Sequence, residues 1–449
     1  MSEESWGAIR PTTFESTRAV LDFGLARATR DFNEWAFPGI GGVAFARQFA
    51  WGVMALRLAP QCQTRSQRPM VVAEALEALA SFIAIHRVPD YADSARIRGK
   101  RKLADNRDNF SYTWLRNRAN YVSQPMRMGT TAGLVGCGLA SGPVARFDRL
   151  RLTDEGLAIA DTILNRRLDG KSQRRTVKSW LLEDWIDADG DVRKAIPRRV
   201  RDVLLPGPST EAEPIPSVSE IEQLSVLVSR NPTRCVMRDA LAVCKAELGV
   251  DGFYADMSST AGQGRLLRAI GDTHQRRRVR AGIAYGHMTA AALNVLNTLA
   301  IELADRRQNN QKLILTKLPL SVTRLLDKLS AATVMLSERL TEARLTQADA
   351  MTFCSQQHPG IAAGSRLEAL VARTKDVFSV IGGDVVFGRV YRAELFAAGN
   401  AMHGENRADL VLADSDAPGE SARRSPVPGR VFRAFSLLDD LCMLDEEVR

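Results

Sequence analysis

Apolar residues recur at three- and four-residue spacing along most of the chain, which is the period of amphipathic and buried helices. Before residue 204 the pattern is clearest from Val43 to Leu58 and from Met70 to His86, and Pro69 stands where the second helix would begin. Later stretches with this period are 219–230, 234–248, 264–270, 279–303, 319–340 and 364–380. The pattern therefore predicts a mainly α protein.

The helical pattern is interrupted by segments rich in proline, glycine and serine. The clearest one spans Leu204 to Glu220 and holds four prolines, which favour an extended connector. We place a linker at 206–218, between an N-terminal domain (1–205) and a helical C-terminal domain (219–449). A polar stretch at 405–429 predicts a long surface loop or a partly disordered insertion. Residues 382–397 alternate in polarity, which predicts a strand or hairpin followed by a helix.

Composition fits an ordinary globular protein. The chain has 449 residues, of which 45% are apolar and 25% charged, enough to bury a sizeable core. We expect no membrane span, because the apolar run 39–59 is interrupted by Arg47, Gln48 and Arg57. The start, MSEESWGAIRP, lacks the features of a secretory signal, so the expected location is the cytoplasm.

The six cysteines are scattered, without a CxxC motif or a Cys/His pair at metal spacing. They are interpreted as small buried apolar residues, and we expect neither a metal nor another cofactor. The five histidines are also far apart in the sequence. Cys354 and His358 are the closest pair of nucleophile and base, but no third group completes a catalytic signature.

Positive charge is concentrated in the first half of the chain. The net charge is +9, and residues 1–205 hold 32 Lys and Arg against 23 Asp and Glu, whereas the remainder holds 29 of each. Within this half, residues 96–127 carry nine cations against Asp105 and Asp108. Those nine are Arg96, Arg98, Lys100, Arg101, Lys102, Arg107, Arg116, Arg118 and Arg127. A second basic run at 166–180 would extend the same patch.

Aromatic residues lie among these arginines, namely Phe110, Tyr112, Trp114 and Tyr121. Cations neutralise phosphates and flat rings stack on unpaired bases, so the mixture favours binding to a nucleic-acid backbone. The same alternation of aromatic residues is also typical of a half-buried strand, with the arginines on a solvated surface. Both interpretations remain open at this stage.

The stretch 144–164, "VARFDRLRLTDEGLAIADTIL", combines three local signals. Ala145 to Leu152 alternates between bulky apolar and charged residues, which predicts a strand or tight hairpin. Thr153 is then expected to cap a helix whose first turn holds Asp154 and Glu155. Upstream, a helix is predicted from about Thr130 to Leu139, ending before Gly142-Pro143.

Asp148, Arg149, Leu152, Thr153 and Gly156 stand in this order as in a MarR-type winged helix, which residues 122–164 resemble. The resemblance implies that Arg149, with Arg146 and Arg151, reaches the DNA backbone or minor groove. It also implies that the helix at 130–139 is the recognition helix. That helix has no Arg, Lys, Asn or Gln to read base edges, which argues against sequence-specific reading. The alternative is a packing module between helical domains.

A second resemblance involves Phe37-Pro38-Gly39, Arg47-Gln48, Trp51 and the run Gln124 to Gly129. These residues are similar to those of uncharacterised bacterial proteins from mobile islands and phage-defence clusters. The resemblance implies a genomic neighbourhood and no mechanism. In the C-terminal half, Gly262-x-Gly264 precedes the run Arg276 to Arg280, but no Gly-Lys-Ser/Thr follows, so it is a weak nucleotide motif.

Together these observations predict a non-enzymatic subunit that binds nucleic acid, DNA rather than RNA, in a bacterial multi-protein system, with anti-phage defence as the expected setting. The alternative is an assembly subunit whose basic face docks an acidic protein partner. An enzyme with a site assembled from distant residues is a third class. The expected contact residues are Arg96, Arg98, Lys100, Arg101, Lys102, Arg116, Arg118, Arg127, Arg146, Arg149 and Arg151.

Overall fold

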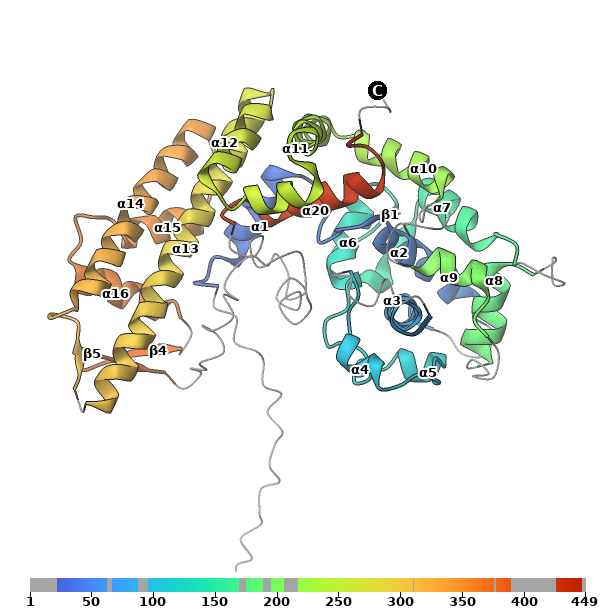
Figure 1. Ribbon diagram of the computed structural model, residues 1–449, viewed down its shortest axis with the longest axis horizontal. Coiled ribbons are helices and arrows are strands. Elements are labelled where there is room, and N and C mark those ends of the chain that lie inside the picture. The colour runs from blue at the N-terminus through green and yellow to red at the C-terminus, as the bar shows by residue number, and fades with distance from the viewer. Residues whose placement is uncertain are drawn as a thin grey trace, which may run out of the picture.

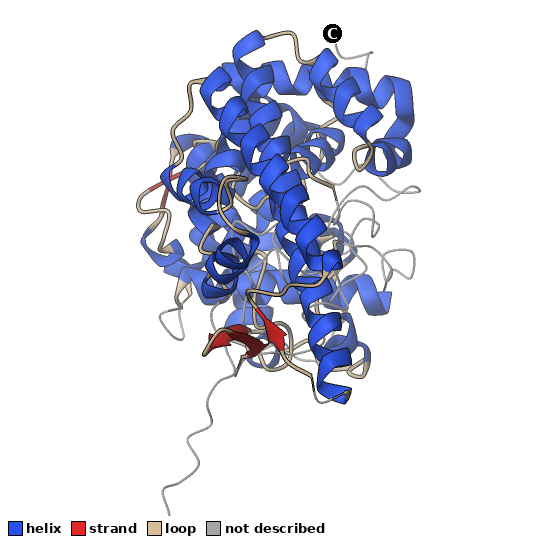
Figure 2. Ribbon diagram, turned by 90° about the vertical axis from the view of Figure 1, so that its left-hand side faces the viewer, coloured by secondary structure: helices blue, strands red, loops and turns tan. Residues whose placement is uncertain are grey.

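The computed structural model describes residues 22–62, 67–87, 96–168, 175–188, 195–205, 217–309, 311–374, 377–388 and 425–445. Within these ranges most residues lie in α-helices and the strands are short, which confirms the predicted mainly α class (Figure 2). The helices form two lobes, each around its own apolar core (Figure 1).

The large core contains apolar residues from Ala36 to Ile283 and from Val427 to Leu444. Its helices and strands are α2 (Ala46–Leu58), α3 (Pro69–Arg87), α4 (Lys100–Ala104), α5 (Tyr112–Leu115), α6 (Arg127–Gly136), β1 (Ala140–Ser141), β2 (Arg151–Leu152), α7 (Asp154–Leu164), α8 (Val177–Ser179), α9 (Arg198–Leu204), α10 (Val218–Ser229), α11 (Pro232–Asp256), α12 (Thr260–Ala269) and α20 (Gly429–Asp440). Short 3-10 helices occur at Ala59–Gln61 and Phe147–Arg149, and a π-helix spans Trp180–Asp187.

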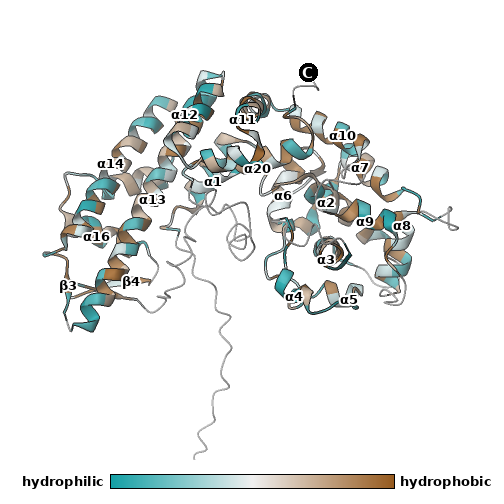
Figure 3. Cartoon of the chain, in the orientation of Figure 1, coloured by the Kyte–Doolittle hydropathy of each residue, from teal (hydrophilic) through white to brown (hydrophobic). Residues whose placement is uncertain are grey.

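The small core contains apolar residues from Phe23 to Phe32 and from Ala281 to Val385. Its elements are α1 (Ala26–Ala36), α13 (Thr273–Gln308), β3 (Leu313–Ile314), α14 (Leu320–Ala343), α15 (Ala348–Gln356), α16 (Ala363–Ala372), β4 (Phe378–Ile381) and β5 (Asp384–Phe387). Apolar and polar positions alternate along α13 and α14, as expected of helices with one buried face (Figure 3).

Helices α1, α13 and α20 join the two cores. Within α13, Val279 belongs to the large core and Ala284 to the small one. The segment before α20 crosses α13 at two glycines, and a Cβ atom at Gly286 would overlap the carbonyl oxygen of Pro426. Glycine at this position therefore lets the carboxy-terminal segment reach the junction between the lobes.

The sheet of the small core has the order β3-β5-β4, with both pairs antiparallel. Its presence corrects the sequence analysis, which predicts one helix from Gly364 to Val380. Helix α16 ends at Ala372 and β4 begins at Phe378, where β-branched residues follow. The strand expected within 382–397 is β5, and the helix expected after it lies outside the described ranges, because residues 389–424 are not among them.

Other helix boundaries shift for local reasons. α2 begins at Ala46 rather than Val43, because the Gln48 side chain accepts a hydrogen bond from the Ala44 backbone N–H (2.5 Å) before the first turn. α11 continues past Leu248 to Asp256 through a kink at Gly249, whose φ of 68° favours glycine.

The predicted linker at 206–218 lies almost entirely outside the described ranges, since 206–216 are not placed. The helices on either side of it, α9 and α10, both pack into the large core through Leu204 and Leu224. The change from one core to the other occurs within α13. Most of the predicted loop at 405–429 is likewise outside the described part of the chain.

Helix α3 is long and apolar enough, by length and composition alone, to cross a membrane. Most of its apolar window (72%) is buried inside the protein, a property it shares with the core helices of water-soluble folds. It also carries two buried carboxylates, Glu74 and Glu77, which are both hydrogen-bonded within the fold.

Candidate nucleic-acid interface

The stretch 140–164 folds as a short hairpin followed by a capped helix. β1 pairs with β2 through Ala140 and Leu152, and a 3-10 turn at Phe147–Arg149 lies between them. The sequence pattern predicts a strand or hairpin over 145–152, but only Arg151 and Leu152 of that stretch form a strand, and it pairs with Ala140–Ser141 upstream. The alternation instead reflects the 3-10 turn, in which Phe147 belongs to the large core, as does Leu150 after it. Arg149 between them is exposed, whereas Asp148 is half-buried.

Thr153 caps α7, as predicted. Its hydroxyl accepts a hydrogen bond from the Gly156 backbone N–H (3.2 Å) and donates one to the Gly138 carbonyl (2.7 Å). A Cβ atom at Gly156 would overlap the Leu139 carbonyl oxygen, so glycine is needed where α7 passes the strand. The Leu-Thr-x-x-Gly step therefore has a complete structural explanation.

Three arginines on this hairpin, Arg146, Arg149 and Arg151, are called the hairpin arginines below. All three are exposed, and none forms an ion pair within the described ranges. The neighbouring acid, Asp148, is engaged elsewhere, because its Oδ1 accepts a hydrogen bond from the Met70 backbone N–H at the start of α3 (2.7 Å). The hairpin arginines therefore present positive charge to solvent without an ion pair in the described ranges.

Helix α6, which corresponds to the predicted recognition helix, is packed against the loop at 39–42. The Gly42 backbone N–H donates to the Gly129 carbonyl at 2.8 Å, and a Cβ atom at Gly133 would lie 2.5 Å from the Ile40 carbonyl oxygen. Thr130 and Thr131 are buried as well. The glycine-rich composition of α6 thus serves close helix–loop packing, and the helix offers no side chain suited to base edges.

Several cations of the 96–127 segment are committed to carboxylates. Arg96 forms an ion pair with buried Asp440 (2.7 Å) and lies over the Phe45 ring. Arg127 donates from Nε to Glu74 at 2.7 Å, and Arg118 donates to the same carboxylate at 2.8 Å.

Arg98 is buried and donates to the Gln124 carbonyl oxygen (2.9 Å). Its charge lies near the buried Glu77 carboxylate, whose pKa is raised by burial although the Arg98 charge and hydrogen bonds from Tyr121 and Met126 lower it. Four arginines that we expected to contact nucleic acid therefore form contacts within the fold instead. They are Arg96, Arg98, Arg118 and Arg127. Arg118 is the most exposed of these four.

The remaining cations of the segment lie on α4, in the loop after it, where Arg107 is exposed, and directly after α5, where Arg116 stands. Arg101 and Lys102 are exposed, and Lys102 reaches the Arg118 carbonyl oxygen at 3.4 Å. Lys100 is half-buried, and Arg116 lies over the Tyr112 ring with its guanidinium carbon 5.7 Å from the ring centre. Two exposed basic groups are compared below. They are the hairpin arginines and the α4 pair, Arg101 and Lys102.

The aromatic residues of the segment are buried, so the expectation that they stack on bases is wrong. Phe110, Tyr112 and Tyr121 belong to the large core, and Trp114 is half-buried against it. The Trp185 indole N–H donates to the Phe110 carbonyl oxygen at 2.8 Å. Residues 112–115 form α5 rather than a strand, which means that the period-two alternation arises from core packing.

Helix α3 separates the two exposed basic groups. Asp148 of the hairpin contacts Met70 at its start, whereas the Leu103 carbonyl oxygen of α4 contacts His86 near its end (2.8 Å). With a rise of about 1.5 Å per residue, these two points are roughly 24 Å apart along the helix. Arg68, exposed at the same end of α3 as the hairpin, was missed in the sequence analysis because it lies far from the basic runs.

The residues of the second resemblance, at 37–39, 47–48, 51 and 124–129, include several that make packing contacts within the large-core lobe. The Arg234 guanidinium donates to the Pro38 carbonyl (2.8 Å) and the Gly136 carbonyl (2.6 Å), which ties the loop at 37–42 to α6. The Trp51 indole N–H donates to the Leu204 carbonyl at 3.1 Å. These contacts explain the residue types structurally.

The other candidate chemistries of the sequence do not assemble. Burial raises the pKa of the Cys354 thiol, whereas His358 is exposed and accepts a hydrogen bond from the Gly360 backbone N–H (3.2 Å). Gly262 lies within α12 with its N–H donated to the capping Ser259 hydroxyl (2.9 Å), so it is unavailable to a phosphate. All six cysteines are free thiols, and the ranges that the structure describes hold no cluster of three or more metal-ligating side chains.

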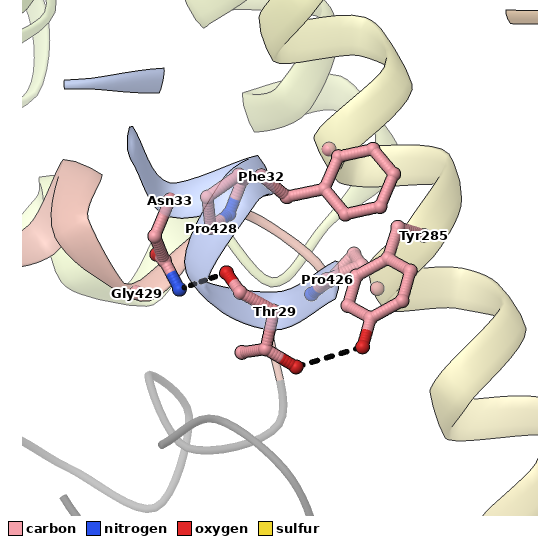
Figure 4. Close-up of a pocket in the computed structure, with 9 residues that line it drawn as sticks. Thr29, Phe32, Asn33, Tyr285, Pro426, Pro428 and Gly429 are labelled. Atoms are coloured by element: carbon pink, nitrogen blue, oxygen red, sulfur yellow. Dashed lines mark hydrogen bonds between the residues drawn. The ribbon is translucent and has the colours of Figure 1, made fainter. Parts of the chain in front are cut away.

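A crevice lies where α1, α13 and the segment before α20 meet (Figure 4). The Thr29 hydroxyl and the Tyr285 hydroxyl are 2.7 Å apart, and the Asn33 side chain donates to the Thr29 carbonyl at 2.9 Å. The Asn33 Oδ1 atom accepts from the Arg430 backbone N–H (2.9 Å). These polar groups are satisfied by one another, which identifies the crevice as part of the junction between the lobes.

Comparison of the chain with family models, with curated proteins and with solved structures found no match.

Proposed function

We propose that the chain binds the phosphate backbone of DNA through the hairpin arginines, as a non-enzymatic subunit of a multi-protein system. The observation that carries this proposal is the exposure of three arginines on one short hairpin whose acidic neighbour is turned away to cap α3. We further propose that α6, the hairpin and α7 act as a winged-helix module. Arg101 and Lys102 form a second exposed basic group at the other end of α3, about 24 Å along that helix, and we propose that they contact the same duplex further along its backbone.

Arginine suits this role because its planar guanidinium donates two parallel hydrogen bonds to a phosphate. The contact is directed at the backbone, since Arg127 of α6 is held by Glu74 and the two threonines of the helix are buried, which leaves them unsuited to base readout. The buried aromatic residues argue in the same direction, because stacking on unpaired bases is not available to them. Duplex DNA therefore fits better than single strands.

The proposal predicts a definite salt dependence. Each phosphate neutralised contributes about −0.9 to the slope of log K against log salt, so five contacts give about −4.5. Affinity should then fall roughly 500-fold between 50 and 200 mM salt. Without the hairpin arginines the slope should shrink to about −1.8, a fall of roughly 12-fold over the same range.

The test is fluorescence anisotropy with a labelled 20-base-pair duplex. The variant Arg146→Glu/Arg149→Glu/Arg151→Glu should lose both affinity and slope. A matched control reverses three exposed cations of the small-core lobe, Lys317→Glu/Arg324→Glu/Lys328→Glu, and should keep the native slope. An unchanged slope in the hairpin variant would refute the proposal. A native chain that retains no duplex at 50 mM salt but binds an acidic protein would instead support the assembly role.

A further inference from the structure

A second group of arginines gathers where the start of α13 meets the end of α14. The two helices pack antiparallel, since Ser321 near the start of α14 donates to Glu302 near the end of α13 (2.6 Å). Arg277 and Arg280 of α13 therefore lie beside the last turn of α14. With Arg339 and Arg344 of α14 they form what we call the arginine cluster.

The positive charge of the cluster affects the pKa of one nearby carboxylate, Glu342. The pKa of Glu342 is lowered by its hydrogen bond from Arg339 and further by the charges of Arg280 and Arg277. The Arg339 Nη1 to Glu342 Oε1 distance is 2.6 Å. One exposed carboxylate thus lies among several guanidinium groups and offsets only part of their charge.

The other charged groups at this end leave that excess in place. Asp272 caps α13, with its carboxylate accepting from the Gln275 backbone N–H (2.6 Å). Arg276 donates to the Ile270 carbonyl (2.9 Å) and so is used within the fold. Glu338 is exposed one turn before Glu342. The acids at the end of α14 are therefore fewer than the arginines around them.

Arg344 occupies a backbone position that a purely structural turn would give to glycine. It ends α14 with φ 53° and ψ 42°, the left-handed conformation that glycine and asparagine adopt most readily. An arginine here accepts conformational strain, and its side chain is exposed directly after the last turn of α14, the turn that Arg277 and Arg280 lie beside. Residues held in such conformations cluster at functional sites.

We propose that the arginine cluster is a second surface for the phosphate backbone of nucleic acid, which makes the chain bivalent. Figure 1 shows α14 in one lobe and β1 in the other, so the two surfaces lie on different parts of the fold. The chain then bridges two duplex segments. The choice of nucleic acid as the ligand rests on the function proposed above. The existence of a second site that binds anions does not.

The experiment counts how many 12-base-pair duplexes one chain binds at 50 mM salt, and measures capture of a fluorescent duplex by chain already held on an immobilised one. The native chain should bind two duplexes. The cluster variant Arg277→Glu/Arg344→Glu should bind one, with second-duplex capture reduced at least tenfold. The control Arg324→Glu/Lys328→Glu makes the same charge change on α14 away from the cluster and should still bind two.

A neutral variant, Arg277→Gln/Arg344→Gly, guards against misfolding, because glycine relieves the left-handed position. It should melt at or above the native temperature and also bind one duplex. Two duplexes bound by either cluster variant, or a native chain that binds only one, would overturn the inference. If instead the hairpin variant still binds two duplexes and the cluster variants one, the function proposed for the hairpin fails while the arginine cluster stands.

Discussion

Replacing Glu220 with glutamine removes the anion at the centre of a buried ionic network. The Glu220 carboxylate accepts from Arg47 (2.6 Å), from Arg166 (2.6 Å) and from both the backbone N–H (3.0 Å) and hydroxyl (2.7 Å) of Ser217. Arg47 is 0% exposed, and its Nε and Nη2 atoms have no hydrogen-bond partner in the described part of the fold. The glutamine variant leaves this guanidinium without the carboxylate it contacts.

The size of the effect follows from burial. Removing one partner of a buried ion pair costs about 3 to 5 kcal/mol, and Arg166, which is 20% exposed, regains water and adds little. A domain stable by about 5 to 15 kcal/mol should therefore lose between about a fifth and all of its free energy of unfolding. Urea unfolding followed by far-UV circular dichroism at pH 7 measures the difference.

Acidification gives the same experiment a second readout. Burial raises the pKa of Glu220, but the charges of Arg47 and Arg166 and the hydrogen bonds of Ser217 outweigh it, and the net pKa is lowered. A lowered pKa means that the ion pair contributes its full stability above the unfolded value of about 4.3 and loses it as pH falls through the folded value. The difference between native and Glu220→Gln should shrink below about pH 4.

A double variant separates charge burial from packing. Arg47→Met/Glu220→Leu replaces both buried ions with apolar side chains, and should be more stable than Glu220→Gln alone because no unpaired charge remains in the core. The reasoning is refuted if Glu220→Gln costs less than about 1 kcal/mol at pH 7. A difference that grows on acidification would refute it equally.

Three further substitutions test local features of the fold. Thr153→Ala removes the α7 cap and should cost about 1 kcal/mol in urea unfolding, with a Thr153→Ser control that keeps the native value. Gly286→Ala should lower the melting temperature, because its Cβ would overlap the Pro426 carbonyl. The control Gly264→Ala on α12 should raise it slightly through helix propensity. An unchanged melting temperature for Gly286→Ala would contradict the close approach of α13 to the segment before α20. Glu77→Gln should also lower stability to urea, because its side-chain NH2 group would replace an oxygen that accepts hydrogen bonds from Tyr121, Met126 or Arg127; an unchanged unfolding midpoint would count against this assignment.

Local signals in the sequence were sufficient for several long helices and for two helix starts, whereas the short helices α4, α5, α8 and α9 were not predicted. Pro69 begins α3 and Thr153 caps α7, because each acts through atoms within its own first turn. The period of the apolar residues likewise indicated α13 and α14. The helix predicted through Val380 failed for the opposite reason, since β4 is stabilised by pairing with β5 and not by its own residues.

The candidate interface was harder to predict, because a run of cations does not reveal its partners. Glu74 lies 44 residues before Arg118 and 53 before Arg127, and Arg96 pairs with a carboxylate in the last described helix. Nothing near these arginines in the sequence marks them as paired. The hairpin arginines differ, since the acid between them, Asp148, was visible in the sequence but its hydrogen bond from Met70 was not.

Helix α20 has a consequence for how the chain is made. It contacts residues almost 400 positions earlier, through Arg430 with Asn33 and through Asp440 with Ala46. Synthesis proceeds at about 5 to 20 residues per second, so α20 leaves the ribosome roughly 20 to 80 s after α1 and α2. Throughout that interval the apolar surface that α20 will cover stays open to water, so this protein should depend on chaperones during translation more than a fold closed by near neighbours.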